Sequence, residues 1–205
     1  MNRIEIKERA KELLGKNLFG SAWLMPLLVC FIQAAILSVA SNIVSVASVF
    51  LAGPLAYGIY FIFVKIARVG AAVEIGDLFK GFNSEYMSNF LTGLLTGVYT
   101  FLWSLLFVIP AIVKYYSYAM AMYLRIDHPE YTAKQAIDES RRLMEGHKGD
   151  LFILDLSFIG WYFVGSLCMG VGTLWVVPYH QMARTLFFES IKNQGVIEVR
   201  EVIAE

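Results

Sequence analysis

The most constraining feature of the chain is a stretch of 48 residues, from Asn17 to Val64, that contains no charged side chain. A helix that crosses a bilayer needs about 20 apolar residues. The stretch is therefore long enough for two membrane-spanning helices and a short turn between them. We expect this turn between Ala47 and Pro54, because the Gly53-Pro54 pair breaks helical geometry.

A second apolar block runs from Tyr86 to Leu124 and is interrupted only by Lys114. Pro110 divides this block, and proline is well suited to the first turn of a helix. We therefore expect one span over residues 88–109 and a shorter span over residues 110–126.

A third apolar block runs from Leu151 to Phe188. Glycines near its middle, followed by Pro178, predict spans over residues 151–171 and 176–192. A backbone in lipid must satisfy its own hydrogen bonds, so each span is expected to be a helix. The sequence thus predicts an all-α, polytopic helical membrane protein. Its six transmembrane helices form three hairpins, joined by short cytoplasmic amphipathic helices, in a single membrane domain over residues 1–205.

The composition agrees with this fold class. Hydrophobic residues make up 58% of the chain and charged residues only 17%, against about 25% charged residues in an ordinary soluble domain. Too few charged side chains are present to cover a soluble surface. The two cysteines, Cys30 and Cys168, lie in apolar runs and are expected to act as small apolar residues, not as a disulfide framework.

The distribution of basic residues predicts the orientation in the membrane. Of the 17 Lys and Arg residues, only Lys114 and Arg184 lie in the interior of expected spans, and the three expected hairpin turns hold none. The others lie in the N-terminal segment, the two connections between hairpins and the C-terminal tail. Because cytoplasmic loops carry the excess of basic residues, both termini are expected in the cytoplasm.

The three cytoplasmic segments resemble one another. Each contains an apolar pair close to a glycine, and each hairpin has one proline in its second helix: Gly15, Gly81 and Gly146, and Pro54, Pro110 and Pro178. The pattern predicts a unit of amphipathic helix, glycine cap and helical hairpin, repeated over residues 1–68, 69–128 and 129–205. Chance similarity between leucine-rich segments is the alternative.

The clearest amphipathic helix is expected over residues 132–145. Thr132 and Gln135 have the spacing of a capping box, and Gly146 marks the end of the helix. One face carries Ala133, Ala136, Ile137, Ser140, Leu143 and Met144. A less regular helix of this kind is expected at the N-terminus, with Ile6, Ala10, Leu13 and Leu14. Such helices can lie in the membrane interface, pack beneath the spans or bind a partner.

Asp155 and Arg184 are charged residues within the expected fifth and sixth spans. A carboxylate in lipid costs about 2.5–3.5 kcal/mol on insertion scales, so it normally faces the bundle and finds a partner. Hairpin geometry makes Arg184 the natural partner of Asp155. The two residues form either a structural ion pair or an ion or proton site.

Two further features of the expected spans have a structural and a functional interpretation. Lys114 lies one turn after Pro110, where its ammonium group can extend to the interface or bind an anionic lipid or substrate. Gly93 and Gly97 form a small-residue pattern that allows close approach of two helices, either within the chain or in a dimer.

The three histidines lack the spacing of known metal-binding motifs. His128 and His147 flank the amphipathic helix, and His180 is expected at the membrane interface. We expect no catalytic residues, no metal, no cofactor and no nucleic-acid partner.

Several short motifs resemble a known family. They are Ala10-Lys11-x-Leu13-x-Gly15, Leu78-Phe79-x-Gly81-Phe82, Ile109-Pro110, Tyr116-Ser117-Tyr118-Ala119-Met120 and Ala136-Ile137-x-x-Ser140-x-x-Leu143-Met144-x-Gly146-His147-Lys148. In this order they resemble the bacterial membrane proteins grouped as domain of unknown function 975. The chain departs from that pattern at Ala111, where glycine is expected. The resemblance implies a location in the bacterial cytoplasmic (inner) membrane and adds no activity.

We therefore expect a non-enzymatic protein that acts as a scaffold, regulator or assembly factor for another membrane process. Its expected partners are membrane lipids and either another membrane protein or a second copy of itself. A transporter or permease for a small or lipidic substrate is the alternative, supported by Asp155, Arg184 and the broken helices. An enzyme that acts on lipids through His128, His147 and Asp155 is a third class, for which no acid–base pair at a fixed spacing is visible.

Overall fold

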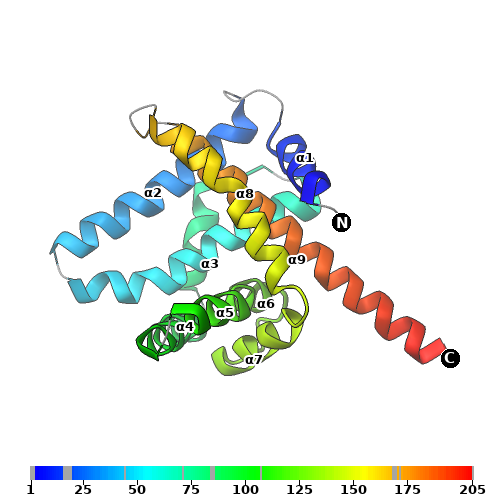
Figure 1. The fold of residues 1–205 in the computed structure, drawn as a ribbon. Coiled ribbons are helices and arrows are strands. Elements are labelled where there is room, and N and C mark those ends of the chain that lie inside the picture. The colour runs from blue at the N-terminus through cyan, green and yellow to red at the C-terminus, as the bar shows by residue number, and fades with distance from the viewer. Residues whose placement is uncertain are drawn as a thin grey trace.

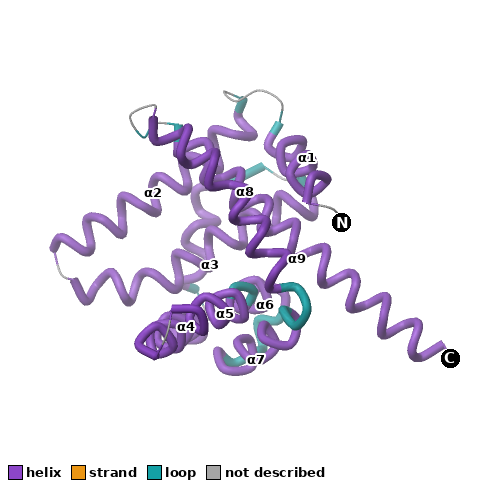
Figure 2. Tube along the Cα trace, in the orientation of Figure 1, coloured by secondary structure: helices purple, strands orange, loops and turns teal. Residues whose placement is uncertain are grey.

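A computed structural model describes residues 3–15, 20–43, 45–70, 72–83, 86–106, 108–167, 170 and 172–204. These residues are helical almost throughout and contain no strand, which confirms the all-α class (Figures 1 and 2). The elements are α1 (Arg3–Leu14), α2 (Ser21–Ile43), α3 (Ser45–Val69), the 3-10 helix η1 (Ile75–Phe82), α4 (Tyr86–Leu106), α5 (Val108–Tyr118), α6 (Ala121–Asp127), α7 (Ala133–Leu143), α8 (Lys148–Leu167) and α9 (Thr173–Ala204).

Three pairs of consecutive helices pack against each other as hairpins: α2 with α3, α4 with α5, and α8 with α9 (Figure 1). Three helical segments are long and apolar enough to cross a membrane: Ala22–Ser41, Ser48–Val69 and Lys148–Leu167. The expected span over residues 110–126 is wrong as a continuous helix, because α5 and α6 are separate helices on either side of Ala119 and Met120.

The break between α5 and α6 is stabilised by a side chain of α7. The hydroxyl of Ser140 donates a hydrogen bond to the carbonyl oxygen of Ser117 at 2.9 Å and accepts one from the amide of Met120 at 3.2 Å. These bonds satisfy backbone groups that the interrupted helix leaves without a helical partner. The sequence of the apolar block gave no indication of the break, since Ser140 lies in another element.

The predicted turn between Ala47 and Pro54 is wrong. α2 ends at Ile43 and α3 begins at Ser45, so Gly53 and Pro54 both lie inside α3. Gly53 is needed there for contact with α4, since a Cβ atom on it would lie 2.8 Å from the carbonyl oxygen of Asn89. The other two prolines of the repeat pattern, Pro110 and Pro178, also lie within helices. Pro110 is in the first turn of α5, and Pro178 is inside α9.

The backbone of η1 packs directly against that of α3 at two glycines. A Cβ atom on Gly58 would lie 1.9 Å from the carbonyl oxygen of Leu78, and a Cβ atom on Gly81 would lie 2.1 Å from that of Pro54. Gly81 therefore allows two backbones to touch and is not the helix cap that the repeat pattern predicted. Gly15 and Gly146, in contrast, follow α1 and α7 with φ angles of 89° and 80°.

An aspartate also stabilises the contact between η1 and α3. Asp77 of η1 is buried and forms ion pairs with Lys65 at 2.9 Å and with Lys80 at 2.7 Å. Burial alone would raise the pKa of Asp77, but the hydrogen bonds from Lys80 and Lys65 outweigh it and hold the pKa below its ordinary value. The carboxylate therefore stays charged between the two ammonium groups.

Both amphipathic helices pack against the hairpins. α7 begins with the expected capping box of Thr132 and Gln135 and turns its apolar face toward α4, α5 and α6. α1 packs against α9 and α2 through Ile6, Ala10 and Leu14, which are buried. In this structure, both apolar faces thus pack against other helices of the same chain.

We expect the substitution Gly58→Ala to lower the free energy of unfolding by about 3 kcal/mol, because the new methyl group would overlap the backbone of η1. Thermal unfolding of the detergent-purified protein measures this change. Gly160→Ala in α8 is the matched control, since a Cβ atom there meets nothing within 4 Å. The control should be neutral or stabilising by up to about 1 kcal/mol. Equal stability of the two variants would contradict the backbone contact.

Candidate functional site

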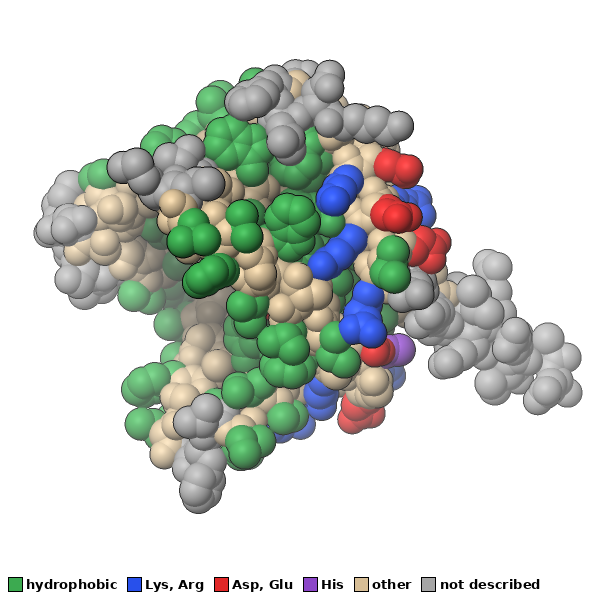
Figure 3. All heavy atoms as spheres, turned by 45° about the horizontal axis from the view of Figure 1, so that its top comes forward, with side chains coloured by type: hydrophobic (Ala, Val, Ile, Leu, Met, Phe, Trp, Pro, Cys, Tyr) green, Lys and Arg blue, Asp and Glu red, His purple; other side chains and the backbone are tan. Residues whose placement is uncertain are grey.

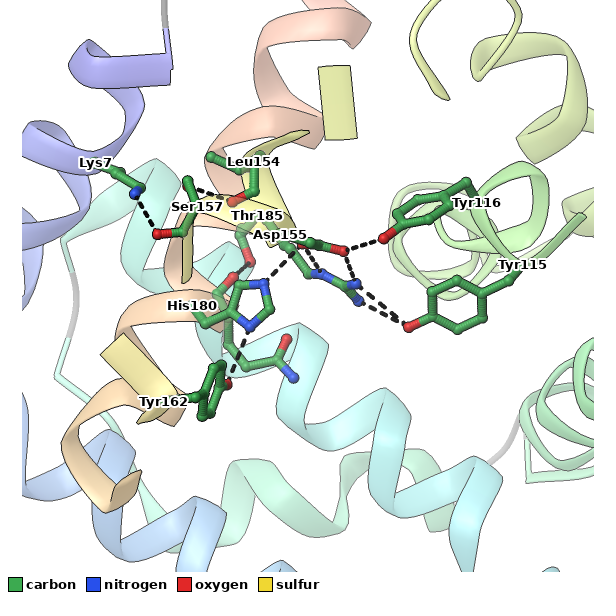
Figure 4. A network of polar contacts seen from close by, with 11 residues as sticks. Lys7, Tyr115, Tyr116, Leu154, Asp155, Ser157, Tyr162, His180 and Thr185 are labelled. Atoms are coloured by element: carbon green, nitrogen blue, oxygen red, sulfur yellow. Dashed lines mark hydrogen bonds and ion pairs between the residues drawn. The ribbon is translucent and has the colours of Figure 1, made fainter. Parts of the chain in front are cut away.

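A cluster of polar side chains lies between α5, α8 and α9 (Figure 4). The carboxylate of Asp155 accepts hydrogen bonds from Nε of Arg184 at 2.9 Å, from Nε2 of His180 at 2.8 Å and from the hydroxyl of Tyr116 at 3.1 Å. A second nitrogen of the Arg184 guanidinium donates to the other carboxylate oxygen. The ion pair expected between Asp155 and Arg184 therefore forms, and both oxygens of the carboxylate are engaged.

Two more tyrosines complete what we call the Asp155 cluster. The hydroxyl of Tyr162 lies 3.1 Å from Nδ1 of His180, and the hydroxyl of Tyr115 accepts a hydrogen bond from Arg184 at 3.3 Å. The ring of Phe158 stacks on the imidazole of His180, with 4.5 Å between the ring centroids. Both ring nitrogens of His180 thus have partners, and its orientation is fixed.

Helical spacing brings these side chains together. His180 and Arg184 are four residues apart on α9, and Asp155 and Tyr162 are seven residues apart on α8, so each pair shares one face of its helix. His180, which the sequence analysis expected at the membrane interface, belongs to the cluster, and its interfacial position stays a prediction. Its spacing from Arg184 was the signal that could have placed it.

The cluster is only slightly accessible. The side chains of Asp155, Arg184 and His180 are 12%, 15% and 17% exposed. The carboxylate of Asp155 and the guanidinium of Arg184 carry opposite charges that balance each other. The main effect of the arrangement is to join α5, α8 and α9 through groups that satisfy one another.

The other charged candidates lie elsewhere. The ammonium group of Lys114 lies 4.8 Å from the ring centroid of Trp103, a cation–π contact between α5 and α4. His128 pairs with Glu130 at 3.0 Å, and His147 with Asp150 at 3.7 Å. Neither histidine belongs to the Asp155 cluster, so the three residues considered for an enzyme are not brought together there.

The described part of the chain contains no group of three or more His, Cys, Asp or Glu side chains that could hold a metal ion. Cys30 lies half-buried in α2, and Cys168 is outside the described residues.

A second charged network was not predicted from the sequence. Asp127 of α6 pairs with Arg68 of α3 at 2.6 Å and with Lys192 of α9 at 2.5 Å, and Arg68 also pairs with Glu189 at 2.7 Å. The four residues come from three elements that are far apart in the sequence, so no local spacing indicates their contact. The network joins the C-terminal ends of α3 and α6 to the middle of α9.

Removal of the carboxylate at position 155 should destabilise the protein. We expect Asp155→Leu to lower the free energy of unfolding by about 3 kcal/mol, since Arg184 would lose its charged partner in a mostly buried position. The double variant Asp155→Leu with Arg184→Met should recover most of this loss, because no charge is then left unpaired. Thermal unfolding in detergent measures the stability of the single and the double variant.

Asp138→Ala is the control for this series. Asp138 pairs with Arg141 on the exposed face of α7 at 3.3 Å, and its removal should cost less than about 0.5 kcal/mol. A double variant that is as unstable as Asp155→Leu would show that the cluster does not act as a structural ion pair.

The comparisons with known proteins agree with the resemblance seen in the sequence. The sequence model of a family described as a protein of unknown function (DUF975) matches residues 1–121 and 107–195. No curated protein and no solved structure matches the chain. Since the two matched segments together cover nearly the whole chain, the protein belongs to the DUF975 family.

Proposed function

We propose that the protein is a six-span protein of the bacterial cytoplasmic membrane, with both termini in the cytoplasm. Three apolar hairpins and three helices of membrane-crossing length support this arrangement. Charged side chains gather toward one side of the molecule in Figure 3, whereas hydrophobic side chains cover the other side. That separation is typical of hairpins that enter a membrane from one face. The threefold repeat stays a prediction, because Gly81 differs in role from Gly15 and Gly146.

One contact of α1 disagrees with a topology of six complete membrane spans. Lys11 of α1 lies 5.5 Å from the ring centroids of both Trp161 in α8 and Tyr179 in α9, close to the turn that joins these helices. The six-span arrangement puts α1 and this turn on opposite sides of the membrane. The position of the turn between α8 and α9 is therefore the decisive point of the topology.

Cysteine labelling in cells tests this point. In a chain with Cys30 and Cys168 replaced by alanine, six spans predict that a Thr173→Cys variant reacts with a membrane-impermeant maleimide in intact cells. An Arg9→Cys variant should react only after the membrane is permeabilised. If both variants react only after permeabilisation, the turn lies on the cytoplasmic side and the six-span topology is wrong.

Within this membrane we propose that the protein acts non-enzymatically, as a scaffold or assembly factor that binds a helix of another membrane protein. The observation that carries the proposal is an apolar groove of about 480 Å³ between α3 and α4. It is lined by Val49, Ala52, Gly53, Ala56, Gly93, Leu94, Gly97, Val98 and Phe101. None of the nine described residues that line the groove is charged, and five of them are glycine or alanine.

Such a groove suits a helix because small residues let two backbones approach closely, and close packing drives helix association in lipid. Gly53 and Gly93 already contact each other within the chain, which is the intrachain role considered for the glycine pattern. Gly97 has no such contact, since a Cβ atom there meets nothing within 4 Å. Gly97 is therefore a glycine of the groove that a partner helix can approach closely.

Native mass spectrometry of the protein, extracted gently from its own membrane, tests the scaffold function. We expect a second polypeptide at fixed stoichiometry, and we expect Gly97→Leu to reduce its occupancy about tenfold by filling the groove. Gly160→Leu is the control, because Gly160 also meets open space but lies in α8, outside the groove. Equal loss of the partner in both variants would contradict the groove as its binding site.

Transport of a small or lipidic substrate is the second candidate function. It is supported by the partly exposed, charged side chains of the Asp155 cluster, which lie between apolar helices. A lone chain or homo-oligomer that retains a discrete small molecule in the same mass spectra would favour transport over scaffolding.

A further inference from the structure

A pocket of about 660 Å³ opens between α1, α8 and the start of α9. This volume is within the range of small-molecule sites in proteins. Four large aromatic residues line it: Trp23, Trp161, Trp175 and Tyr179. None of the Asp155 cluster residues lines this pocket.

The aromatic walls are held in place. The indole nitrogen of Trp23 donates a hydrogen bond to the carbonyl oxygen of Gly15 at 2.6 Å, and both Trp23 and Tyr179 are buried. The ring of Tyr179 is tilted by 59° to that of Trp23 and by 85° to that of Trp161, so the rings form angled walls rather than a stack. Pre-oriented rings lose little entropy when a ligand binds.

Two glycines leave one side of the pocket without side chains. The backbones of Gly165 in α8 and Gly172 before α9 touch, since a Cβ atom on Gly172 would lie 2.7 Å from Cα of Gly165. Both residues line the pocket. Because neither glycine has a side chain, the space between the aromatic rings stays open to a ligand on this side of the pocket.

One face of α1 supplies the charges of the pocket. Glu8, Lys11 and Glu12 line it, and Lys11 and Glu12 follow Glu8 by three and four residues, so they lie on the same side of the helix as Glu8. Two carboxylates therefore accompany one ammonium group. All three side chains are exposed and can move aside without disturbing the apolar packing of α1.

The ammonium group of Lys11 shows where a positive charge can lie against the aromatic rings of the pocket. It lies 5.5 Å from the ring centroid of Trp161 and 5.5 Å from that of Tyr179. The faces of aromatic rings attract cations, and rings arranged as a cage bind ammonium groups more strongly than one ring does. The lysine thus occupies the position that the positive charge of a ligand would take.

We propose that this pocket binds a lipophilic organic cation, such as an amine, quaternary ammonium or phosphonium ion with aromatic or alkyl substituents. The positive charge lies over Trp161 and Tyr179 in place of Lys11, close to the carboxylates of Glu8 and Glu12. The apolar substituents lie against Trp23 and Trp175. The proposal does not rest on the scaffold function, because the groove between α3 and α4 is formed by other helices. It requires α1 beside the turn between α8 and α9, so it holds with that turn on the cytoplasmic side and not with six complete spans.

The charged side chains at the pocket favour a cationic ligand over an anionic one. From the described lining residues, an anionic amphiphile would gain one ammonium group, that of Lys11, and would face two carboxylates. A cation gains both carboxylates and the aromatic faces once Lys11 has moved aside.

Binding of two ions of the same shape and opposite charge tests the proposal. The protein is purified in a neutral detergent and titrated with tetraphenylphosphonium and, separately, with tetraphenylborate, with isothermal calorimetry as the measurement. We expect saturable binding of the phosphonium at one site per chain and no saturable binding of the borate.

Variants of the pocket sharpen the test. Trp161→Leu should weaken phosphonium binding about fivefold, and Lys11→Gln should strengthen it about threefold because the competing ammonium group is gone. Glu8→Gln combined with Glu12→Gln should weaken it about threefold. Trp103→Leu in α4 is the control and should bind like the unchanged protein, since Trp103 does not line the pocket.

Two outcomes would overturn the proposal. Non-saturable binding of both ions that is unaffected by Trp161→Leu would show simple partition into detergent and apolar surface. Preferential binding of the borate, weakened by Lys11→Gln, would show a pocket for anionic amphiphiles. Lys11→Gln and the glutamate variants change exposed side chains only, so they stay informative even if Trp161→Leu fails to fold.

Discussion

Backbone contact at glycine is the constraint on which the architecture depends. η1 and α4 both touch the backbone of α3, at Gly58 and Gly81 in one case and at Gly53 and Gly93 in the other. A side chain larger than hydrogen at any of these positions would separate the helices. Because α3 also packs against α2, α6 and α9, the distances set at these glycines determine where the remaining helices lie. Packing of this kind suits an apolar chain, since close helix contact in lipid relies on small residues.

The charged side chains of the interior serve the same purpose. Asp127 and Asp155 each contact two or more polar partners, and each of their clusters joins helices from different hairpins. Carboxylates that are saturated in this way are poorly placed to act on a substrate. The surfaces available for binding are instead the groove between α3 and α4 and the aromatic pocket beside α1. This is why we propose binding functions rather than catalysis.

Sequence reasoning worked where the signal was local. The capping box at Thr132 and the buried face of α7 follow directly from residue spacing, and the pairing of Asp155 with Arg184 follows from the hairpin. It failed where a residue type had two possible roles. Gly53 and Pro54 have the composition of a turn, but the glycine serves helix contact, and the helix continues through the proline. His180 and the break at Met120 depend on side chains from other elements, which one sequence pattern does not show.

The pocket shows how a packing requirement can create a binding surface. α1 must bury Ile6, Ala10 and Leu14, and it does so mainly against α9 and α2. With those residues facing inward, helical spacing brings Glu8, Lys11 and Glu12 to the pocket beside the rings of α8 and α9. The hydrogen bond from Trp23 to Gly15, which has a left-handed conformation, then joins the end of α1 to α2. The charge pattern at the pocket is therefore a consequence of how α1 docks, so a change that releases α1 would remove the carboxylates and leave the rings in place.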